Sequence, residues 1–391
     1  MHAMRIFIPK ETEPAEHRTP LVPAGVAKLA ALGAQVDVEA GLGETVHFLD
    51  AEYRSAGATI VADRRQGLAS ADIVLRLNPP PTAEIAHFKP GCIHISYLDP
   101  FNSPDLLRSL AVSGTSAICM EMIPRSTVAQ KMDALSSQAS LAGYAAVLLG
   151  ASRLDRIFPM MMTPAGTLPP AKVFIIGAGV AGLQAIATAK RLGAVVEAFD
   201  TRASVGEQVK SLGAKFVKAD LGEMGQTAQG YAKELTPEQL AKQREAMEQC
   251  CAQADLVITT AQIFGRKAPL IVTTAMIWRM KPGSIIVDMA VETGGNVEGS
   301  RPDGEAVVHG VRVLGCRNLA GRVPRAASAM YSGNLANLVE HFWDRETRTF
   351  RLDPNADILK DCLVTHRGVI LNEALRNPAA PRPSVTADTS S

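Results

Sequence analysis

The chain has 391 residues, which exceeds the length of one ordinary α/β domain and predicts two or three domains. Its 40 lysines and arginines nearly balance its 39 aspartates and glutamates, and only 5% of its residues are aromatic, so the composition argues against a nucleic-acid-binding protein. Hydrophobic residues make up 47% of the chain, enough for sizeable cores, and the six cysteines show neither a CxxC pair nor a zinc-ligand spacing, which predicts reduced thiols in a cytosolic protein.

The first third of the chain alternates strand-like and helix-like segments. Its N-terminal residues lack the basic start and the long apolar run of a signal peptide, so export is not expected. Short apolar runs predict strands, and an alanine-rich segment predicts a helix between the first two. The expected strands are residues 4–10, 34–40, 71–77, 92–98 and 116–121, and the expected helix is residues 23–33. This is an α/β pattern without a phosphate-binding loop.

A long uncharged stretch, residues 134–152, raises the question of a membrane span. Its four serines, one glutamine and two glycines predict instead a helix of small residues that packs within the protein. The next segment contains four prolines and the run Met160, Met161 and Met162. For these methionines we expect a contact between subunits, with packing in a core as the alternative.

Residues 172–200 hold every part of a dinucleotide-binding βαβ unit in the right order. A short apolar strand, residues 172–176, is followed by glycines at GxGxxG spacing and by a helix over residues 180–192. The first glycine permits the tight turn, the second lets the backbone approach a pyrophosphate, and the third lets the helix pack closely on the strand. The amides at the helix start favour phosphates. A glycine-rich structural turn is the alternative. The predicted cofactor-binding residues are Gly177, Gly179, Val180, Ala181 and Gly182.

Asp200 directly follows the second strand of this unit, residues 195–199. An acidic side chain at this place accepts hydrogen bonds from the adenosine ribose hydroxyls and repels a 2′-phosphate, so NAD is favoured over NADP. Arg202 leaves one ambiguity, because a guanidinium there could receive a 2′-phosphate, stack on adenine or face solvent.

The second predicted domain continues with further apolar strands and ends near residue 317. These strands are expected at residues 215–219, 255–261, 284–290 and 311–315, with a movable loop over residues 219–235. A helical segment, residues 318–343, is expected to return to the first domain. The sequence therefore predicts two Rossmann-like domains with parallel sheets separated by a cleft, the first of them discontinuous. The predicted divisions are residues 1–124 plus 318–372, residues 125–317, and a disordered tail over residues 373–391.

The motifs of hydrolases, kinases and metalloenzymes are absent from the sequence, which has no GxSxG, HExxH or GxxxxGK[ST] and no clustered metal ligands. No metal is therefore expected. A dinucleotide enzyme that oxidises an alcohol or an amine also needs a group that takes up a proton. His17 and His94 are the candidates in the first domain, but His94 lies within a predicted strand and fits a core histidine. The residues alone identify no acid/base group.

Two segments carry a specific family resemblance. Residues 124–144, PRSTVAQKMDALSSQASLAGY, and residues 158–194, which begin FPMMMTPAGTLPPAKVFIIGAG, closely resemble the soluble NAD-binding component (alpha subunit, domain I) of proton-translocating NAD(P) transhydrogenases. That component shares its ancestry and fold with alanine dehydrogenase. The resemblance covers residues 4–372 and implies an oxidoreductase subunit that passes hydride between NADH and an NADP⁺ bound on a partner.

Mechanism separates the two branches of this family. Alanine dehydrogenases use a lysine and a histidine of the first domain for substrate binding and proton transfer, and the matching positions here are Asn78 and Tyr97. Hydride transfer between two nicotinamides requires no acid/base residue, so the resemblance favours a transhydrogenase subunit. An NAD-dependent amino-acid dehydrogenase of the alanine type is the alternative, and a dinucleotide-sensing regulatory protein without hydride chemistry is a third hypothesis.

The resemblance also implies site residues. Arg125, Gln130 and Asp133 match a loop that holds the dihydronicotinamide, with Gln130 assigned to the nicotinamide ribose and to the partner's nucleotide. Without the resemblance, a polar loop that caps the following helix would explain the same residues. Tyr231 matches a mobile loop that folds over bound NADH. The residues implied at the adenosine and nicotinamide side of the cofactor are Thr260, Ala261 and Gln262.

The assembly implied by the resemblance has several chains. This chain would hold NAD(H), and a beta subunit would hold NADP(H). The chain ends in a polar tail, which resembles the form of the enzyme whose membrane segments are separate polypeptides, so a small membrane subunit is also expected. Family members are dimers. We therefore expect a cytoplasmic homodimer that associates peripherally with the inner membrane through its partner subunits.

Overall fold

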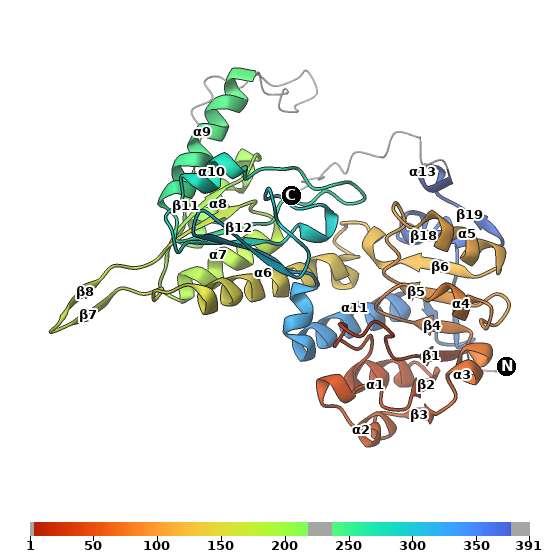
Figure 1. Ribbon diagram of the computed structural model, residues 1–391. Helices are drawn as coiled ribbons and strands as arrows, with labels where there is room; N and C mark the ends of the chain where they lie inside the picture. Colours follow the sequence, from red (N-terminus) through yellow and green to blue (C-terminus); the bar gives the residue numbers. More distant parts are fainter. Residues whose placement is uncertain (1–3, 218–236, 377–391) are drawn as a thin grey trace. The chain divides into compact units, whose positions relative to one another are not determined.

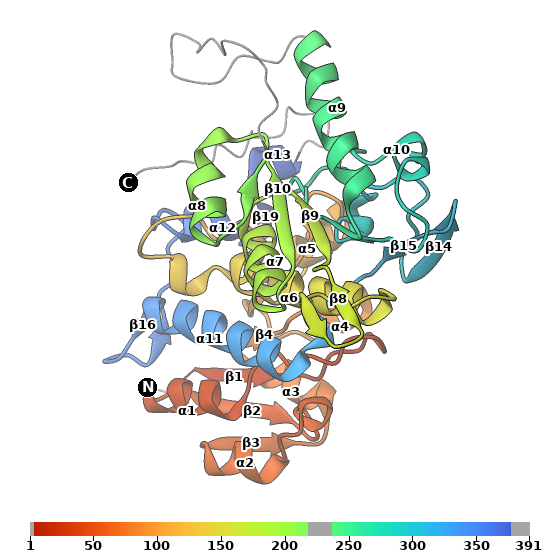
Figure 2. The same cartoon turned by 90° about the vertical axis from the view of Figure 1, so that its left-hand side faces the viewer.

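The computed structural model describes residues 4–217 and 237–376 of the chain (Figures 1 and 2). The chain divides into two compact units, which comprise Met1–Gln138 with Ala320–Ser391 and Ala139–Leu319. Each unit contains a large, mainly parallel sheet accompanied by helices. The predicted α/β architecture with a discontinuous first domain is therefore confirmed.

The sheet of the first unit has eight strands within the described residues, in the order β19-β18-β6-β5-β4-β1-β2-β3. Strands β1 to β6 pair in parallel, whereas β18 and β19 pair antiparallel. The strands are β1 (Arg5–Ile8), β2 (Gln35–Glu39), β3 (Ala58–Val61), β4 (Ile73–Leu75), β5 (Ile93–Ser96), β6 (Ser116–Cys119), β18 (Leu363–His366) and β19 (Val369–Ile370). The helices are α1 (Pro23–Ala31), α2 (Asp50–Ser55), α3 (Arg64–Ser70), α4 (Thr82–Ile85), α5 (Pro104–Val112), α11 (Pro324–Phe342), α12 (Leu359–Cys362) and α13 (Glu373–Arg376).

Helix α11 returns the chain to the first unit, as predicted for residues 318–343. It lies beside α1 in both views (Figures 1 and 2). Its side chains Tyr331, Leu335 and Val339 are fully buried in one core cluster with residues of the first strands. The second stretch of chain therefore supplies part of the core of the first unit.

The first unit extends further along the chain than the sequence predicts. The predicted boundary lies at residue 124, whereas the unit continues to Gln138. Ala129 and Met132 are fully buried in the same core cluster as the α11 side chains. The segment after residue 124 therefore packs as part of the first unit.

Helix α6 (Ala134–Arg153) is the one helix in the described part of the chain with the length and apolarity of a membrane span. Ala146 and Val147 of this helix are buried in a core cluster of the second unit. A Cβ atom at Gly143 would lie 2.1 Å from the carbonyl oxygen of Ala181, so the helix backbone closely approaches its neighbour. These contacts agree with the predicted packing helix of small residues.

The sheet of the second unit has seven strands within the described residues, in the order β11-β10-β9-β12-β13-β15-β14. All neighbours pair in parallel except β14 and β15. The strands are β9 (Lys172–Ile176), β10 (Val195–Phe199), β11 (Lys215–Phe216), β12 (Leu256–Thr259), β13 (Ile285–Asp288), β14 (Gly304–Val308) and β15 (Val311–Gly315). The main helices are α7 (Val180–Arg191), α8 (Gly206–Ser211), α9 (Pro237–Gln253) and α10 (Thr274–Trp278). A separate hairpin of β7 (Met161–Thr163) and β8 (Gly166–Leu168) precedes β9.

The structure contains antiparallel edge strands that the sequence prediction lacks. β14 joins β15 through a two-residue turn, His309 and Gly310, in which both residues have positive φ angles of 51° and 76°. β18 joins β19 through Arg367 and Gly368, with φ angles of 46° and 85°. Two-residue turns of this kind match the twist of antiparallel strands. Each turn therefore closes a hairpin at the edge of a parallel sheet.

The disordered tail predicted for residues 373–391 is wrong at its start. Glu373–Arg376 forms helix α13, and Leu375 is buried in a core cluster of the first unit together with Val364. Burial of the Leu375 side chain stabilises this last helical turn. The prediction of a disordered tail rested on the overall composition of the segment and did not include this contact. Residues 377–391 lie outside the described residues.

His94 is a fully buried core histidine of β5, stacked on Phe88 and hydrogen-bonded through Nε2 to Ser96 Oγ at 2.9 Å. Burial, with a smaller contribution from the charge of Arg76, lowers the pKa of His94 from 6.5 to about 3. Below pH 6.5, His94 therefore binds a proton in the unfolded chain but stays neutral in the folded chain. The free energy of unfolding falls as the pH falls from 6.5 toward 3.

We expect the contribution of His94 to reduce the free energy of unfolding by about 2 kcal/mol when the pH falls from 6.5 to 5. The substitution His94→Gln should make the slope of the free energy of unfolding against pH shallower by about one bound proton over this window. Denaturant unfolding at several pH values measures this slope. The same chemical change at an exposed position, His17→Gln, is the matched control. Equal slopes for wild type and His94→Gln would contradict the prediction.

Candidate functional site

The glycine turn lies at the point where the strand order of the second sheet reverses. β9 is the first strand of this sheet along the chain, and β10 and β12 pair with it on opposite sides. Ligands of open α/β sheets bind beyond the carboxyl ends of the strands at such a point. Thr260, which directly follows β12, donates its hydroxyl to the carbonyl oxygen of Gly177 at 3.1 Å. The ends of β9 and β12 are thus tied together where a ligand is expected.

Each of the three glycines meets a different steric demand. Gly177 has a φ of +99°, and a Cβ atom there would lie 2.4 Å from the Thr260 hydroxyl. A Cβ atom at Gly182 would lie 1.9 Å from the carbonyl oxygen of Gly177. At Gly179, by contrast, a Cβ atom would have only Arg202 Nη2 as a neighbour, at 4.0 Å. The turn therefore needs glycine at 177 and 182 for its own geometry, whereas Gly179 borders open space.

Helix α7 starts at this open space. Gly179 is its N-cap residue, and no side chain caps the helix. The carbonyl oxygen of Gly179 accepts the N–H of Leu183 at 2.8 Å, so the regular hydrogen-bond pattern begins there. The amides of Val180 and Ala181 belong to the first turn, where a helix N-terminus stabilises an anion. This end of α7 can hold a phosphate.

Asp200 lies at the end of β10, next to the glycine turn, and its carboxylate is fully hydrogen-bonded. Oδ2 accepts the N–H of Ala178 at 2.8 Å and Arg202 Nη2 at 3.0 Å, and Oδ1 accepts the backbone N–H of Arg202 at 2.8 Å and its Nε at 3.0 Å. Burial raises the pKa of Asp200, but the hydrogen bonds from Arg202 outweigh it and hold the pKa below its usual range. A carboxylate accepts about four hydrogen bonds. A ribose hydroxyl that binds Asp200 must therefore displace part of the Arg202 contact.

The loop after β12 is held by a buried amide, Asn296, for which the sequence carries no motif. Asn296 is fully buried, and its side chain accepts the N–H of Ala261 at 3.1 Å and donates to the Ala261 carbonyl oxygen at 2.9 Å. The buried carboxylate of Asp288 in turn accepts the N–H of Asn296 at 3.0 Å. Gln262 donates its side-chain amide to the carbonyl oxygen of Met289 at 2.7 Å. The structure therefore brings Thr260, Ala261 and Gln262 to the same switch point as the glycine turn and fixes them there.

The corresponding switch point of the first unit, between β1 and β4, is filled by charged side chains. Glu11 accepts the N–H of Leu77 at 2.8 Å, and its carboxylate lies 3.6 Å from Arg76 Nη2. Arg76 is fully buried and donates to Glu84 at 2.7 Å. Ion pairs thus occupy the place that the first amides of α7 hold in the second unit.

Arg125, Gln130 and Asp133 lie in the first unit, before and at the start of α6. Gln130 begins the 3₁₀ helix η3 (Gln130–Met132), and the side chains of Arg125 and Gln130 are exposed. Asp133 accepts the N–H of Ser136 at 2.9 Å and so caps α6. Asp133 therefore has the helix-capping role of an ordinary polar loop, whereas the amide of Gln130 stays exposed.

Asn78 and Tyr97, the positions that the family resemblance sets against the lysine and histidine of alanine dehydrogenases, both lie in the first unit. Asn78 donates its amide to Glu16 Oε2 at 3.3 Å. The Tyr97 hydroxyl is buried, with no hydrogen-bond partner within the described residues, and burial raises the pKa of Tyr97 well above its usual value. The same region holds Arg18, whose guanidinium makes two hydrogen bonds to Glu16. Glu16 therefore accepts hydrogen bonds from both Asn78 and Arg18, whereas the Tyr97 hydroxyl takes no part in them.

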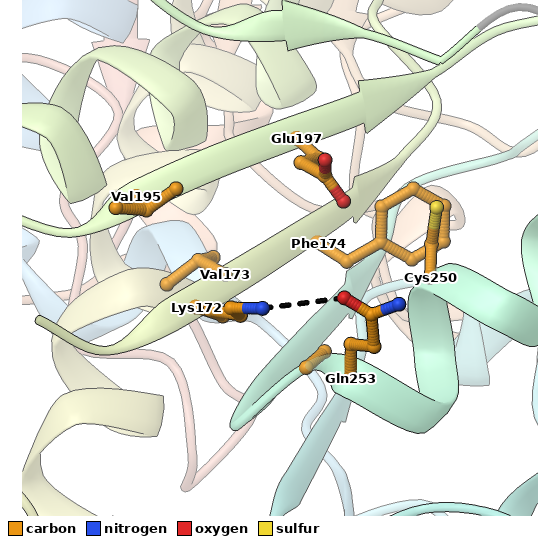
Figure 3. A pocket seen from close by; sticks show the side chains of 8 residues that line it. Lys172, Val173, Phe174, Val195, Glu197, Cys250 and Gln253 are labelled. Atoms are coloured by element: carbon orange, nitrogen blue, oxygen red, sulfur yellow. Dashed lines mark hydrogen bonds between the residues drawn. The ribbon is translucent and has the colours of Figure 1, made fainter.

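Tyr231 lies outside the described residues. Among the residues that the structure does describe, no group of three histidine, cysteine, aspartate or glutamate side chains could hold a metal ion. A small pocket in the second unit lies between β9, β10 and α9 (Figure 3). It is lined by the first residues of β9 and β10, Lys172 and Val195, and Lys172 Nζ donates to Gln253 at 3.2 Å. This pocket lies toward the amino ends of the strands, opposite to the glycine turn.

Comparison with known proteins agrees with this geometry. Residues 7–142 match the family described as the N-terminal domain of alanine dehydrogenase/PNT, and residues 146–373 match the C-terminal domain of the same description. The chain is 44% identical over 384 residues to the first part of NAD(P) transhydrogenase subunit alpha of Rhodospirillum rubrum, which covers 96% of this chain and 100% of the relative. It is 31% identical to alanine dehydrogenase of Mycobacterium tuberculosis, with 95% of each chain covered.

Solved structures show the same relationship. The transhydrogenase from Sinorhizobium meliloti has a TM-score of 0.85 at 43% identity, covering 94% of this chain and 99% of that one. An L-alanine dehydrogenase has a TM-score of 0.77 at 26% identity, covering 95% of this chain and 98% of that one. Both similarities extend over both units.

Proposed function

Because the chain belongs to the alanine dehydrogenase/PNT family of oxidoreductases, we propose that it is the NAD(H)-binding alpha subunit of a proton-translocating NAD(P) transhydrogenase. It binds NADH at the glycine turn of the second unit, and the hydride passes to NADP⁺ held by a beta subunit. Gln130 positions the two nucleotides, Arg125 and Asp133 support its loop, and Tyr231 folds over the bound NADH.

The observation that carries this proposal is a dinucleotide turn without a proton-transfer group. The geometry around Gly177, Gly179 and Asp200 suits NAD(H), while Asn78 and Tyr97 stand where an alanine dehydrogenase needs its lysine and histidine. Hydride transfer between two nicotinamides releases no proton at the reacting carbons. The reaction therefore depends on holding two nicotinamides at reactive distance.

The partners follow from the same proposal. NADP(H) binds to the beta subunit, and a small membrane subunit joins the assembly, which couples hydride transfer to proton translocation. The relative in Rhodospirillum rubrum is named as only the first part of subunit alpha, which supports an alpha function divided between polypeptides. We propose that the chain itself lies in the cytoplasm and attaches to the inner membrane through these subunits.

The test mixes the full chain with NADH, the NADP-binding domain of a transhydrogenase beta subunit, and thio-NADP⁺. Rapid reduction of thio-NADP⁺ that requires both proteins is the expected result. Tight NADH binding without transfer would instead support a dinucleotide-sensing protein.

The second candidate is an alanine-type dehydrogenase, which the 31% identity to the Mycobacterium tuberculosis enzyme favours. An assay of the isolated chain with NADH, pyruvate and ammonia decides between the two. Robust turnover there would overturn the transhydrogenase proposal. We expect none, because Asn78 and Tyr97 supply neither the lysine nor the histidine of an alanine dehydrogenase.

We further propose that the chain is a homodimer whose contact includes the β7–β8 hairpin. The hairpin projects away from the sheet of the second unit (Figure 1). The apolar side chains of Met162 and Leu168 in the hairpin are 72% and 53% exposed, and that of Met160, directly before β7, is 60% exposed. An isolated two-stranded hairpin is marginally stable in water, and exposed apolar clusters mark contact surfaces. A second copy of the chain would cover these side chains.

The substitution Met162→Asp should therefore shift the chain from dimer to monomer, because a charge would be buried in the contact. Light scattering coupled to size exclusion measures the mass. The matched control is Val112→Asp, which changes an apolar side chain that is 89% exposed on the first unit and should leave the dimer intact. A monomeric wild type, or a Met162→Asp variant that stays dimeric, would contradict the proposal.

A further inference from the structure

We infer that Asn334 and Asn337 of α11 are positioning residues that fix the η3 turn and thereby set where Gln130 meets the second nucleotide. The inference rests on the hydride transfer proposed above. Helix α11 lies about 200 residues further along the chain than Gln130. The inference is that this helix helps to hold Gln130 in the position that hydride transfer requires.

Both asparagines bind the same backbone atom. The carbonyl oxygen of Lys131 accepts Asn334 Nδ2 at 3.0 Å and Asn337 Nδ2 at 2.9 Å. Lys131 directly follows Gln130 and is the middle residue of η3. A carbonyl oxygen has two lone pairs, and here both have a side-chain donor. The peptide unit between Lys131 and Met132, one residue beyond Gln130, is therefore held from two successive turns of one helix.

Each asparagine is itself held by a donor on its oxygen. Ser137 donates its hydroxyl to Asn334 Oδ1 at 2.7 Å, and Lys28 Nζ donates to Asn337 Oδ1 at 2.6 Å. These donors determine which end of each amide faces the Lys131 carbonyl. Asn334 is only 7% exposed, so water does not replace it easily.

Two further anchors hold the residues that follow Lys131. Met132 is fully buried in the core, and Asp133 caps α6 through Ser136. The turn is thus fixed at three successive residues after Gln130. A side chain that must meet a separate protein's nucleotide needs such support, because a displacement of about 1 Å can cost about a hundredfold in rate.

The experiment compares wild type with the double variant Asn334→Ala/Asn337→Ala and with Asn337→Asp. The aspartate keeps the size of the side chain and its Lys28 partner but cannot donate to the Lys131 carbonyl. For both variants we expect an unchanged NADH dissociation constant and a fall of about tenfold to a hundredfold in single-turnover hydride transfer to thio-NADP⁺ on the beta-subunit domain. Amide hydrogen exchange of residues 126–133 should become faster.

Ser332→Ala is the matched control for stability. Ser332 is a buried residue of the same helix, and its hydroxyl accepts the N–H of Val22 at 3.1 Å rather than a group of the η3 turn. This variant should lower the melting temperature but keep the transfer rate. Wild-type transfer rates in both asparagine variants would overturn the inference and leave the proposed function standing. Absence of transfer by wild type would overturn the proposed function and the inference with it.

Discussion

Replacing Gln130 by asparagine should leave NADH affinity nearly unchanged and slow hydride transfer by about a hundredfold or more. The η3 turn that carries Gln130 is fixed through Lys131, Met132 and Asp133, so the backbone cannot follow a shortened side chain. The substitution withdraws the amide by about one carbon–carbon bond, roughly 1.5 Å. A lost contact that acts in the transition state lowers the rate without weakening ground-state binding.

Two measurements separate these effects. Fluorescence titration gives the NADH dissociation constant, and stopped-flow mixing with thio-NADP⁺ on the beta-subunit domain gives the transfer rate. The control is Gln66→Asn, the same chemical change at an exposed position of α3 in the same unit. A large loss of NADH binding, with an unchanged rate per bound complex, would show that Gln130 serves the cofactor rather than the transfer step.

The dinucleotide unit could be predicted from sequence because its determinants are local. The strand, the three glycines, the helix and Asp200 all lie within residues 172–200, and the structure places them as expected for a βαβ unit. What the sequence could not indicate is the state of Asp200, since its contact with Arg202 depends on side-chain conformation. The pairing leaves both carboxylate oxygens occupied.

The supports of the site could not be predicted, because they connect distant residues. Asn296 holds Ala261 over 35 residues, and Asn334 holds Lys131 over 203 residues. A single sequence gives no periodicity or motif for such pairs. The two hairpins at the sheet edges are different, because their turns are local. Each turn has a glycine as its second residue, in His309-Gly310 and Arg367-Gly368, and glycine readily adopts the positive φ that such a turn requires.

The second large effect concerns Gly179. Replacing it by alanine should weaken NADH binding at least about tenfold, or about 1.4 kcal/mol, with little change in melting temperature. The fold tolerates the substitution, because Gly179 has a φ of −76° and a Cβ atom would meet only Arg202 Nη2 at 4.0 Å. The same Cβ atom would occupy the space through which a pyrophosphate approaches the first amides of α7.

Two other glycine substitutions make this result interpretable. Gly333→Ala places a Cβ atom in open space on α11 and should change neither NADH affinity nor stability adversely. Gly182→Ala places a Cβ atom 1.9 Å from the Gly177 carbonyl oxygen, so it should reduce both the melting temperature and NADH affinity. Calorimetry of NADH binding and thermal unfolding of the three variants give the comparison. If Gly179→Ala binds NADH as wild type does, the pyrophosphate does not lie at this end of α7, and the glycines serve only the packing of helix on strand.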